Sequence, residues 1–189
     1  MGRRSAAFEE VPGWLIRPAI RAMTTHTIRP ATLGDLAALT DIYNHYVVHT
    51  AVTFDLRPST VDERRPWFED HKASGPHRLL VATNGEGQCL GYASTSRWRP
   101  KAAYDTTVEA SVYCHPAAVG QGCGTALYSA LFQLLSHEDV RTIVAGISLP
   151  NPASIALHTR FGFQPVGVFH AVGRKFDRYW DVAWYERAC

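Results

Sequence analysis

VEASVYC, residues 108–114, runs directly into HPAAVGQGCGTALYSALFQLL, residues 115–135. The first run alternates apolar with polar side chains, a period of two that is typical of a strand with one buried face. The second run contains glycines at Gly120, Gly122 and Gly124, followed by the spacing of apolar residues that gives a helix one buried face. These apolar residues are Cys123, Ala126, Leu127, Ala130, Leu131, Leu134 and Leu135. The stretch therefore predicts a strand, a glycine-rich turn and a helix, in that order.

The turn at residues 120–124 is suited to binding an anion. Glycine lets the backbone turn sharply and approach a ligand closely, and a helix start adds unpaired N–H groups and the positive end of the helix dipole. The turn lacks the lysine of nucleoside triphosphate loops, since Thr125 follows Gly124 directly, and its G-x-G-x-G spacing differs from the dinucleotide fingerprint. Glycines that serve only helix packing are the alternative. We favour a phosphate-bearing cofactor.

Residues 119–124 resemble the coenzyme A loop of the GCN5-related N-acetyltransferases (GNAT), Gln/Arg-x-x-Gly-x-Gly/Ala, with Val119 in place of the Gln or Arg. Further runs match in the same order between residues 27 and 184, and they are most similar to the phosphinothricin acetyltransferase branch; they are residues 42–46, 107–113, 149–152 and 180–182. The resemblance implies an α/β (α+β) fold, with a mixed central β-sheet flanked by helices. It implies one GNAT domain at residues 25–189, after an N-terminal extension at residues 1–24.

The resemblance also implies acetyl-CoA as the cosubstrate. Its contacts would come from the central strand, the glycine-rich loop and the start of a later helix; the residues concerned are Ser111, Val112, Tyr113, Val119, Gly120, Gln121, Gly122, Cys123, Gly124 and Asn151. From the residues alone, Asn151 directly before Pro152 is a helix N-cap. Capping by itself explains Asn151, although one side chain can serve both roles.

Three residues are candidates for proton transfer. A carboxylate in mid-strand is unusual. Glu109 could simply pair with a surface cation, but its position ten residues before Val119 of the coenzyme loop resembles that of the family's general base, and this resemblance implies the same role for Glu109. His158 occupies the tyrosine position of a run that resembles the family's Tyr-x-x-x-Gly-Phe signature. Either His158 or Tyr128 would protonate the leaving thiolate, although Tyr128 lies beside the buried helix face. Cys114 and Cys123 are not expected to be nucleophiles, because direct transfer needs none and buried thiols are inert.

The acceptor site is less clearly marked. Residues 96–104 contain three cations and two aromatics, and a solvated loop is the default interpretation. By resemblance, Arg99 and the aromatic Tyr104 five residues later contact the acceptor, and a guanidinium suits a carboxylate or phosphinate. The resemblance also implies acceptor contacts from Asn44 and Tyr179, although an aromatic such as Tyr179 is first of all core or interface material.

Composition limits the remaining possibilities. The 189 residues, 46% of them apolar, suit a single domain, and a net charge of +2 is too small to indicate a nucleic-acid surface. The cysteines lack CxxC spacing and the histidines show no ligand pattern, so we predict a reduced, cytoplasmic protein without a metal site. No apolar run approaches the roughly 20 residues needed to cross a bilayer, and the N-terminus does not read as a signal peptide.

The other elements follow from periodicity, capping and turn residues. We expect strands at residues 27–29, 78–83, 89–98, 141–147, 164–171 and 175–184, a hairpin turn at 84–87, and helices at 33–49, 60–73 and 152–161.

The implied activity is acetyl transfer from acetyl-CoA to a small primary amine, by direct attack in a ternary complex, in a homodimeric enzyme without nucleic-acid or membrane partners. Two other functions stay open: acetylation of protein or peptide amines, and a non-catalytic module that binds coenzyme A. The compact loop around Arg99 favours a small zwitterion over a peptide. The presence of both Glu109 and His158 argues against the non-catalytic module.

Overall fold

The computed structural model describes residues 26–189, so the predicted extension at residues 1–24 lies outside the described residues. Seven strands form one sheet in the order β1-β2-β3-β4-β5-β7-β6. All neighbours pair antiparallel except β4 and β5, which are parallel. The strands are β1 Thr27–Pro30, β2 Leu79–Thr83, β3 Cys89–Arg97, β4 Thr107–Cys114, β5 Thr142–Ser148, β6 Gln164–Lys175 and β7 Arg178–Ala188. This mixed sheet in a single domain confirms the predicted fold class.

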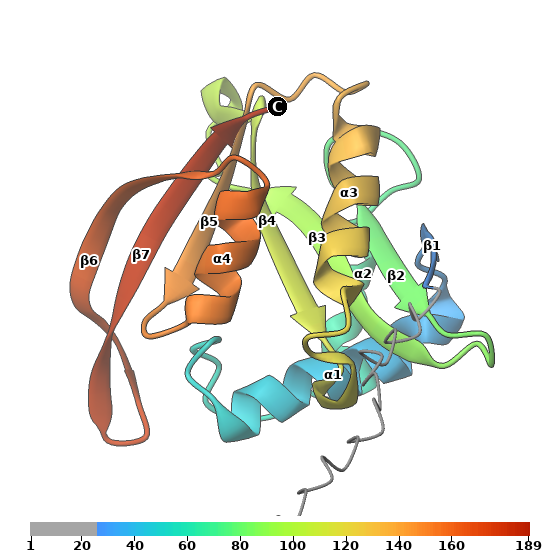
Figure 1. Cartoon of the computed structure of the whole chain (residues 1–189), viewed down its shortest axis with the longest axis horizontal. Coiled ribbons are helices and arrows are strands. Elements are labelled where there is room, and N and C mark those ends of the chain that lie inside the picture. The colour runs from blue at the N-terminus through green and yellow to red at the C-terminus, as the bar shows by residue number, and fades with distance from the viewer. Residues whose placement is uncertain (1–25) are drawn as a thin grey trace, which may run out of the picture.

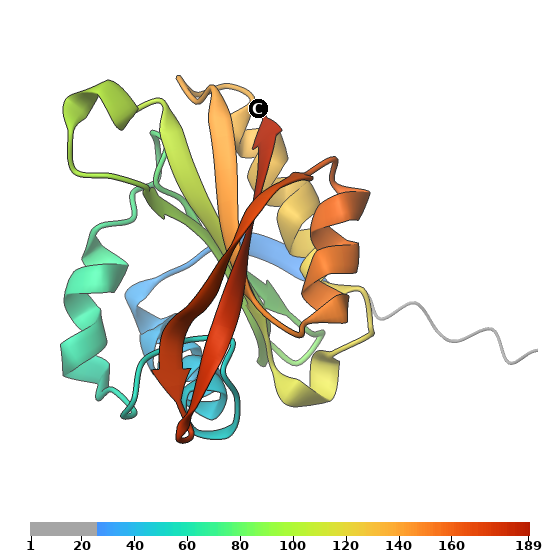
Figure 2. The same ribbon diagram turned by 90° about the vertical axis from the view of Figure 1, so that its left-hand side faces the viewer.

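Helices cover both faces of the sheet (Figure 2); they are α1 Leu36–His49 and α2 Val61–Glu69 on one face, and α3 Cys123–Leu135 and α4 Pro152–Arg160 on the other. On the α3 face, Leu127 and Leu131 are fully buried in the larger apolar cluster. On the opposite face, Leu39 and Ile42 of α1 belong to a second cluster, against which Trp67 of α2 packs. Each face of the sheet therefore has its own hydrophobic core.

β4 and β5 pair only at their beginnings. Residues 107–109 pair in register with residues 142–144, and no further pairing between the two strands is formed. Beyond this point β4 continues along β3, and β5 continues along β7. The two strands move apart (Figure 1), so residues 110–114 present a free backbone edge to a gap inside the sheet.

The predicted turn and helix starts are confirmed. α3 begins at Cys123, and its N-cap is Gly122 in the left-handed conformation, with φ 85°. α4 begins at Pro152, and the Oδ1 atom of Asn151 accepts a hydrogen bond from the Ser154 N–H at 3.1 Å. Gly162, with φ 82°, follows the end of α4 as expected.

α2 is shorter than predicted, because it ends at Glu69 and not at residue 73. Its start agrees with the predicted capping box, since the Thr60 hydroxyl accepts from the Glu63 N–H at 3.2 Å. After Glu69 the backbone turns away: the Lys72 N–H donates to the carbonyl of His77 at 2.9 Å, a loop contact that replaces a helical one.

The β6–β7 hairpin is longer than predicted. The expected strand end, Ala171, has φ 52°, and the pairing of β6 with β7 shifts register around it. Such a bulge interrupts the alternation on which strand prediction depends, and β6 in fact resumes and continues to Lys175. Phe176 and Asp177, with φ 53° and 55°, form the two-residue turn. β7 then continues beyond its predicted end to Ala188.

Candidate active site

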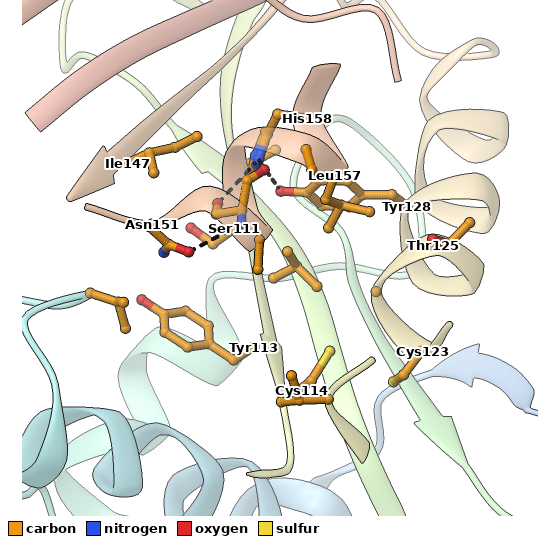
Figure 3. Close-up of a pocket in the computed structure, with 18 of the residues that line it drawn as sticks. Ser111, Tyr113, Cys114, Cys123, Thr125, Tyr128, Ile147, Asn151, Leu157 and His158 are labelled. Atoms are coloured by element: carbon orange, nitrogen blue, oxygen red, sulfur yellow. Dashed lines mark hydrogen bonds between the residues drawn. The ribbon is translucent and has the colours of Figure 1, made fainter. Parts of the chain in front are cut away.

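A cavity of about 700 Å³ occupies the gap between β4 and β5 and reaches the starts of α3 and α4 (Figure 3). All of the predicted coenzyme contacts except Gln121 line it. The side chain of Gln121 instead donates to the carbonyl of Ala117 at 2.6 Å, which places it within the loop's own structure. The end of β4, the glycine-rich loop and the start of α4 therefore converge on one cavity, although they are separated by up to 40 residues in the sequence.

The glycine-rich loop has the geometry of an anion cradle. Gly120 and Gly122 have φ 75° and 85°, and a Cβ added to either would have nothing within 4 Å. Glycine at these two positions therefore permits the left-handed backbone and keeps the space above the loop open. Gly124 differs, because an added Cβ there would lie 3.2 Å from Leu157 Cδ2, so close packing explains this glycine. The first N–H groups of a helix have no partner inside the helix. Together with the helix dipole, these features fit the pyrophosphate of a coenzyme.

The free edge of β4 offers a second binding element. Its far end is held by Tyr46, whose hydroxyl donates to the carbonyl of Cys114 at 2.7 Å. Tyr113 stacks on Tyr92 of β3 with ring centroids 5.4 Å apart, which further fixes the strand. An extended ligand that carries amide groups can pair with such an edge as an additional strand would. Val112 and Tyr113 lie on this edge, in the lining of the cavity.

Tyr128 of α3 and His158 of α4 form a buried pair at the inner end of the cavity, and their side chains point toward each other in Figure 3. His158 Nδ1 lies 2.8 Å from the carbonyl oxygen of Ser154 and so carries the ring hydrogen. The other nitrogen, Nε2, lies 3.0 Å from the Tyr128 hydroxyl. Burial lowers the pKa of His158 and raises that of Tyr128. The imidazole is therefore neutral at pH 7, and the proton available inside the cavity is that of the Tyr128 hydroxyl.

Glu109 lies on the face of β4 that also carries Ser111 and Tyr113, opposite the core-facing Val108. Its carboxylate forms no hydrogen bond or salt bridge with any of residues 26–189, and this disfavours simple pairing with a surface cation. Burial raises the pKa of Glu109, and the charge of Arg99 lowers it in part. A half-buried, unpaired carboxylate with a raised pKa is a candidate general base.

The predicted acceptor loop is exposed. The Arg99 guanidinium lies 5.0 Å from the centre of the Trp98 ring, and Tyr104 meets the same ring edge-on at 5.2 Å. Neither Arg99 nor Tyr104 lines the cavity between β4 and β5. The acceptor contact of Arg99 stays a prediction, and among the described residues its only effect on another predicted site residue is that its charge partly offsets the rise that burial causes in the pKa of Glu109.

The other two predicted acceptor contacts lie elsewhere. Both polar atoms of the Asn44 amide are bonded to the backbone of Ser59, at 2.8 and 2.9 Å, so Asn44 holds the segment between α1 and α2. Tyr179 lies near the tip of the β6–β7 hairpin and is 63% exposed. Their contacts to an acceptor stay predictions, and the geometry gives Asn44 a positioning role.

The sequence did not indicate two features of the site. Arg160 lines the first cavity from the last turn of α4, and it could have been found from its helical spacing, since it follows Ala153, Ala156 and Leu157 on one side of α4. The second feature is another cavity of about 360 Å³ between α1, α2, β3 and β4, which shares Ser111 and Tyr113 with the first.

Among residues 26–189, no group of three or more His, Cys, Asp or Glu side chains is placed to hold a metal ion. No helix of this part is long and apolar enough to cross a membrane.

The sequence profile of the acetyltransferase (GNAT) domain family matches residues 28–184. The chain belongs to this family. It is therefore an acetyltransferase, as the resemblance of residues 119–124 and of the further matching runs predicted.

Similar GNAT proteins include a phosphinothricin N-acetyltransferase of Streptomyces coelicolor, 55% identical over 85% of this chain and 94% of that protein. An L-methionine sulfoximine/L-methionine sulfone acetyltransferase of Salmonella typhimurium is 40% identical over 85% of this chain and 92% of that protein. A putative acetyltransferase of Salmonella typhimurium, solved with its cofactor acetyl-CoA, superimposes with a TM-score of 0.81 at 39% identity, covering 86% of this chain and 93% of that one.

Proposed function

We propose that the protein transfers the acetyl group of acetyl-CoA to the α-amino group of a small amino-acid-like acceptor of the phosphinothricin or methionine sulfoximine/sulfone type. The observation that carries this proposal is the junction of two cavities at β4, because Ser111 and Tyr113 line both of them. A coenzyme in the larger cavity and an amine in the smaller one would meet at this strand. The names of the relatives at 55% and 40% identity support this class of acceptor.

The chain's own residues would then act in sequence. Acetyl-CoA supplies the thioester, and Glu109, directly or through a water molecule, takes the proton from an amine that is mostly protonated at neutral pH. Backbone N–H groups of Val112 and Tyr113 stabilise the charge that develops on the carbonyl oxygen. As the C–S bond breaks, the Tyr128 hydroxyl passes its proton to the leaving sulfur and takes up the second proton lost by the acceptor's nitrogen, while His158 holds the phenol in place at 3.0 Å.

The proton-donor role leads to a prediction about Tyr128. Tyr128→Phe keeps the ring, which packs 4.7 Å from Phe132 and 5.7 Å from Phe161, and removes only the hydroxyl. We expect kcat to fall about tenfold with KM for acetyl-CoA unchanged, a small effect for a general acid because a thiolate leaves readily. Steady-state thiol release measures it. An unchanged kcat would mean that water, not Tyr128, protonates the sulfur. If His158 acts only by positioning Tyr128, His158→Phe should lower kcat by the same factor as Tyr128→Phe.

The acceptor class is tested by competition between small amines and a peptide. We expect kcat/KM for L-phosphinothricin or L-methionine sulfone to exceed that for a short peptide with a free N-terminus by about a hundredfold, because a cavity of about 360 Å³ holds a single amino acid. Thiol release with each acceptor measures the ratio. Faster acetylation of the peptide would replace the proposal with its rival, acetylation of peptide or protein amines.

We also propose that the enzyme is a homodimer. The β6–β7 hairpin ends the sheet and exposes a run of large apolar side chains, defined here as the hairpin patch: Val166, Val168, Phe169, Val172, Phe176 and Tyr179. Grouped exposed apolar residues of this kind mark interaction surfaces. Phe169→Asp should therefore halve the mass measured by sedimentation, whereas Leu56→Asp, outside the hairpin and with 75% exposure, should leave it unchanged. A monomeric wild-type protein would contradict the proposal.

A further inference from the structure

The smaller cavity, about 360 Å³, contains a buried positive charge. It lies between α1, α2 and the β3–β4 pair. Its wall includes Arg64 of α2, which is only 8% exposed, and Tyr92 of β3, which is 1% exposed. The larger cavity opens onto the same two residues of β4, Ser111 and Tyr113. A group bound beside Arg64 is therefore next to the strand where transfer takes place.

Two aromatic rings hold the Arg64 guanidinium. Its Cζ lies 4.0 Å from the centre of the Tyr43 ring and 4.1 Å from that of the Trp67 ring. Stacking of this kind fixes the plane of the guanidinium and leaves its N–H edges for hydrogen bonds. The orientation is set before any ligand arrives.

Two polar atoms in the wall of this cavity lack a hydrogen-bond partner. The Nε of Arg64 and the hydroxyl of Tyr92 are buried and form no hydrogen bond within residues 26–189. The two carboxylates in the wall are engaged elsewhere: Glu63 pairs with Arg57 at 2.8 Å, and Asp55 accepts from the Tyr43 hydroxyl at 2.8 Å. A buried charge without a counter-ion is costly, so such a site favours an anion that carries its own hydrogen-bond acceptors.

We propose that Arg64, with the Tyr92 hydroxyl, binds the α-carboxylate of the acceptor. This proposal rests on the proposed function and deepens it. An α-amino acid carries its amine one carbon away from the carboxylate, so a carboxylate at Arg64 positions the amine toward Ser111 and Tyr113, on the face of β4 that carries Glu109. Arg64 thereby selects free amino acids over amines that lack the adjacent carboxylate, and this leaves Arg99 for the side-chain oxygens.

The test compares two acceptors that differ only at the carboxylate: L-methionine sulfone and its α-carboxamide. The wild-type enzyme should prefer the acid by about tenfold or more in kcat/KM, the value of a charge-assisted hydrogen bond. Arg64→Gln should abolish this preference by raising KM for the acid alone. Arg65→Gln, the neighbouring and more exposed arginine of α2, should keep it. An equal loss for acid and amide in Arg64→Gln would reduce Arg64 to a structural role and overturn the proposal.

Two further measurements make the result independent of folding and of turnover. Tyr92→Phe removes one buried hydroxyl without removing the ring, and it should lower the preference for the acid several-fold; an unchanged preference excludes Tyr92 from the site. Calorimetric binding of the acid and the amide to the protein saturated with coenzyme A needs no acetylation. If no amine is acetylated but the acid alone binds in an Arg64-dependent way, the proposed function fails and the carboxylate site stands. If acid and amide bind equally, the carboxylate site fails.

Discussion

Glu109→Gln is expected to lower kcat by roughly 10²- to 10⁴-fold at neutral pH, with the affinity for acetyl-CoA little changed. The amide keeps the shape of the carboxylate but cannot accept a proton from the acceptor's ammonium group. The carboxylate of Glu109 has no partner among residues 26–189, so its replacement breaks no hydrogen bond or salt bridge there. Steady-state kinetics with acetyl-CoA and L-methionine sulfone measures the loss. Glu86→Gln, in the exposed β2–β3 turn, is the matched control and should be silent.

The pH profile adds a second readout for Glu109. The base must be ionised, so the rate should fall as the pH drops through the pKa of Glu109, which burial raises. Arg99 lowers that pKa in part, and Arg99→Ala should therefore move this acid limb to higher pH. In Glu109→Gln the limb should disappear. A nearly normal rate in Glu109→Gln, or an acid limb that persists in it, would show that another group takes the proton.

Gly122→Val should weaken acetyl-CoA binding by about a hundredfold. The backbone at Gly122 has φ 85°, a conformation that a β-branched residue adopts only at a cost of about 1–2 kcal/mol. The added side chain would also project into the open space above the loop, where nothing lies within 4 Å of a Cβ. Both effects act on the helix start at which the pyrophosphate is expected.

Gly87→Val separates backbone strain from ligand exclusion. Gly87 has φ 79° and equally open space around its Cβ, but it lies in the β2–β3 turn and lines neither cavity. Thermal unfolding should show similar destabilisation in Gly87→Val and Gly122→Val. Calorimetry should show a loss of acetyl-CoA affinity only in Gly122→Val, and equal affinities in the two variants would place the phosphates away from the loop.

Local signals made much of the fold predictable. The β4–turn–α3 unit, the capping box at Thr60 and the start of α4 each depend on residues only a few positions apart, and all three agree with the structure. The end of α2 and the bulge in β6 were missed because tertiary hydrogen bonds and strand register decide them. Neither leaves a periodic trace in the sequence.

The site was predictable only where a local motif marks it. The glycine loop and Glu109 lie within one such stretch. The Tyr128–His158 contact joins residues 30 positions apart, and sequence reasoning could propose both residues without seeing that they form one pair. The Arg64 cavity was missed entirely, because it depends on how α1 and α2 pack on β3 and β4. The bonds of Asn44 to Ser59 join residues 15 positions apart and depend on the fold, and the acceptor contact that the resemblance implies for Asn44 stays a prediction.

The central claim is direct acetyl transfer from acetyl-CoA to the α-amine of a small amino-acid-like acceptor. A single-turnover experiment tests it most directly. The protein is mixed with acetyl-CoA that is labelled in its acetyl group and then with L-phosphinothricin or L-methionine sulfone, and mass spectrometry follows the label on both the acceptor and the protein. The account predicts that the label passes to the acceptor's nitrogen at the rate of thiol release, with no labelled protein at any time. Labelled protein that forms before the product, or label found on neither acceptor, would contradict it.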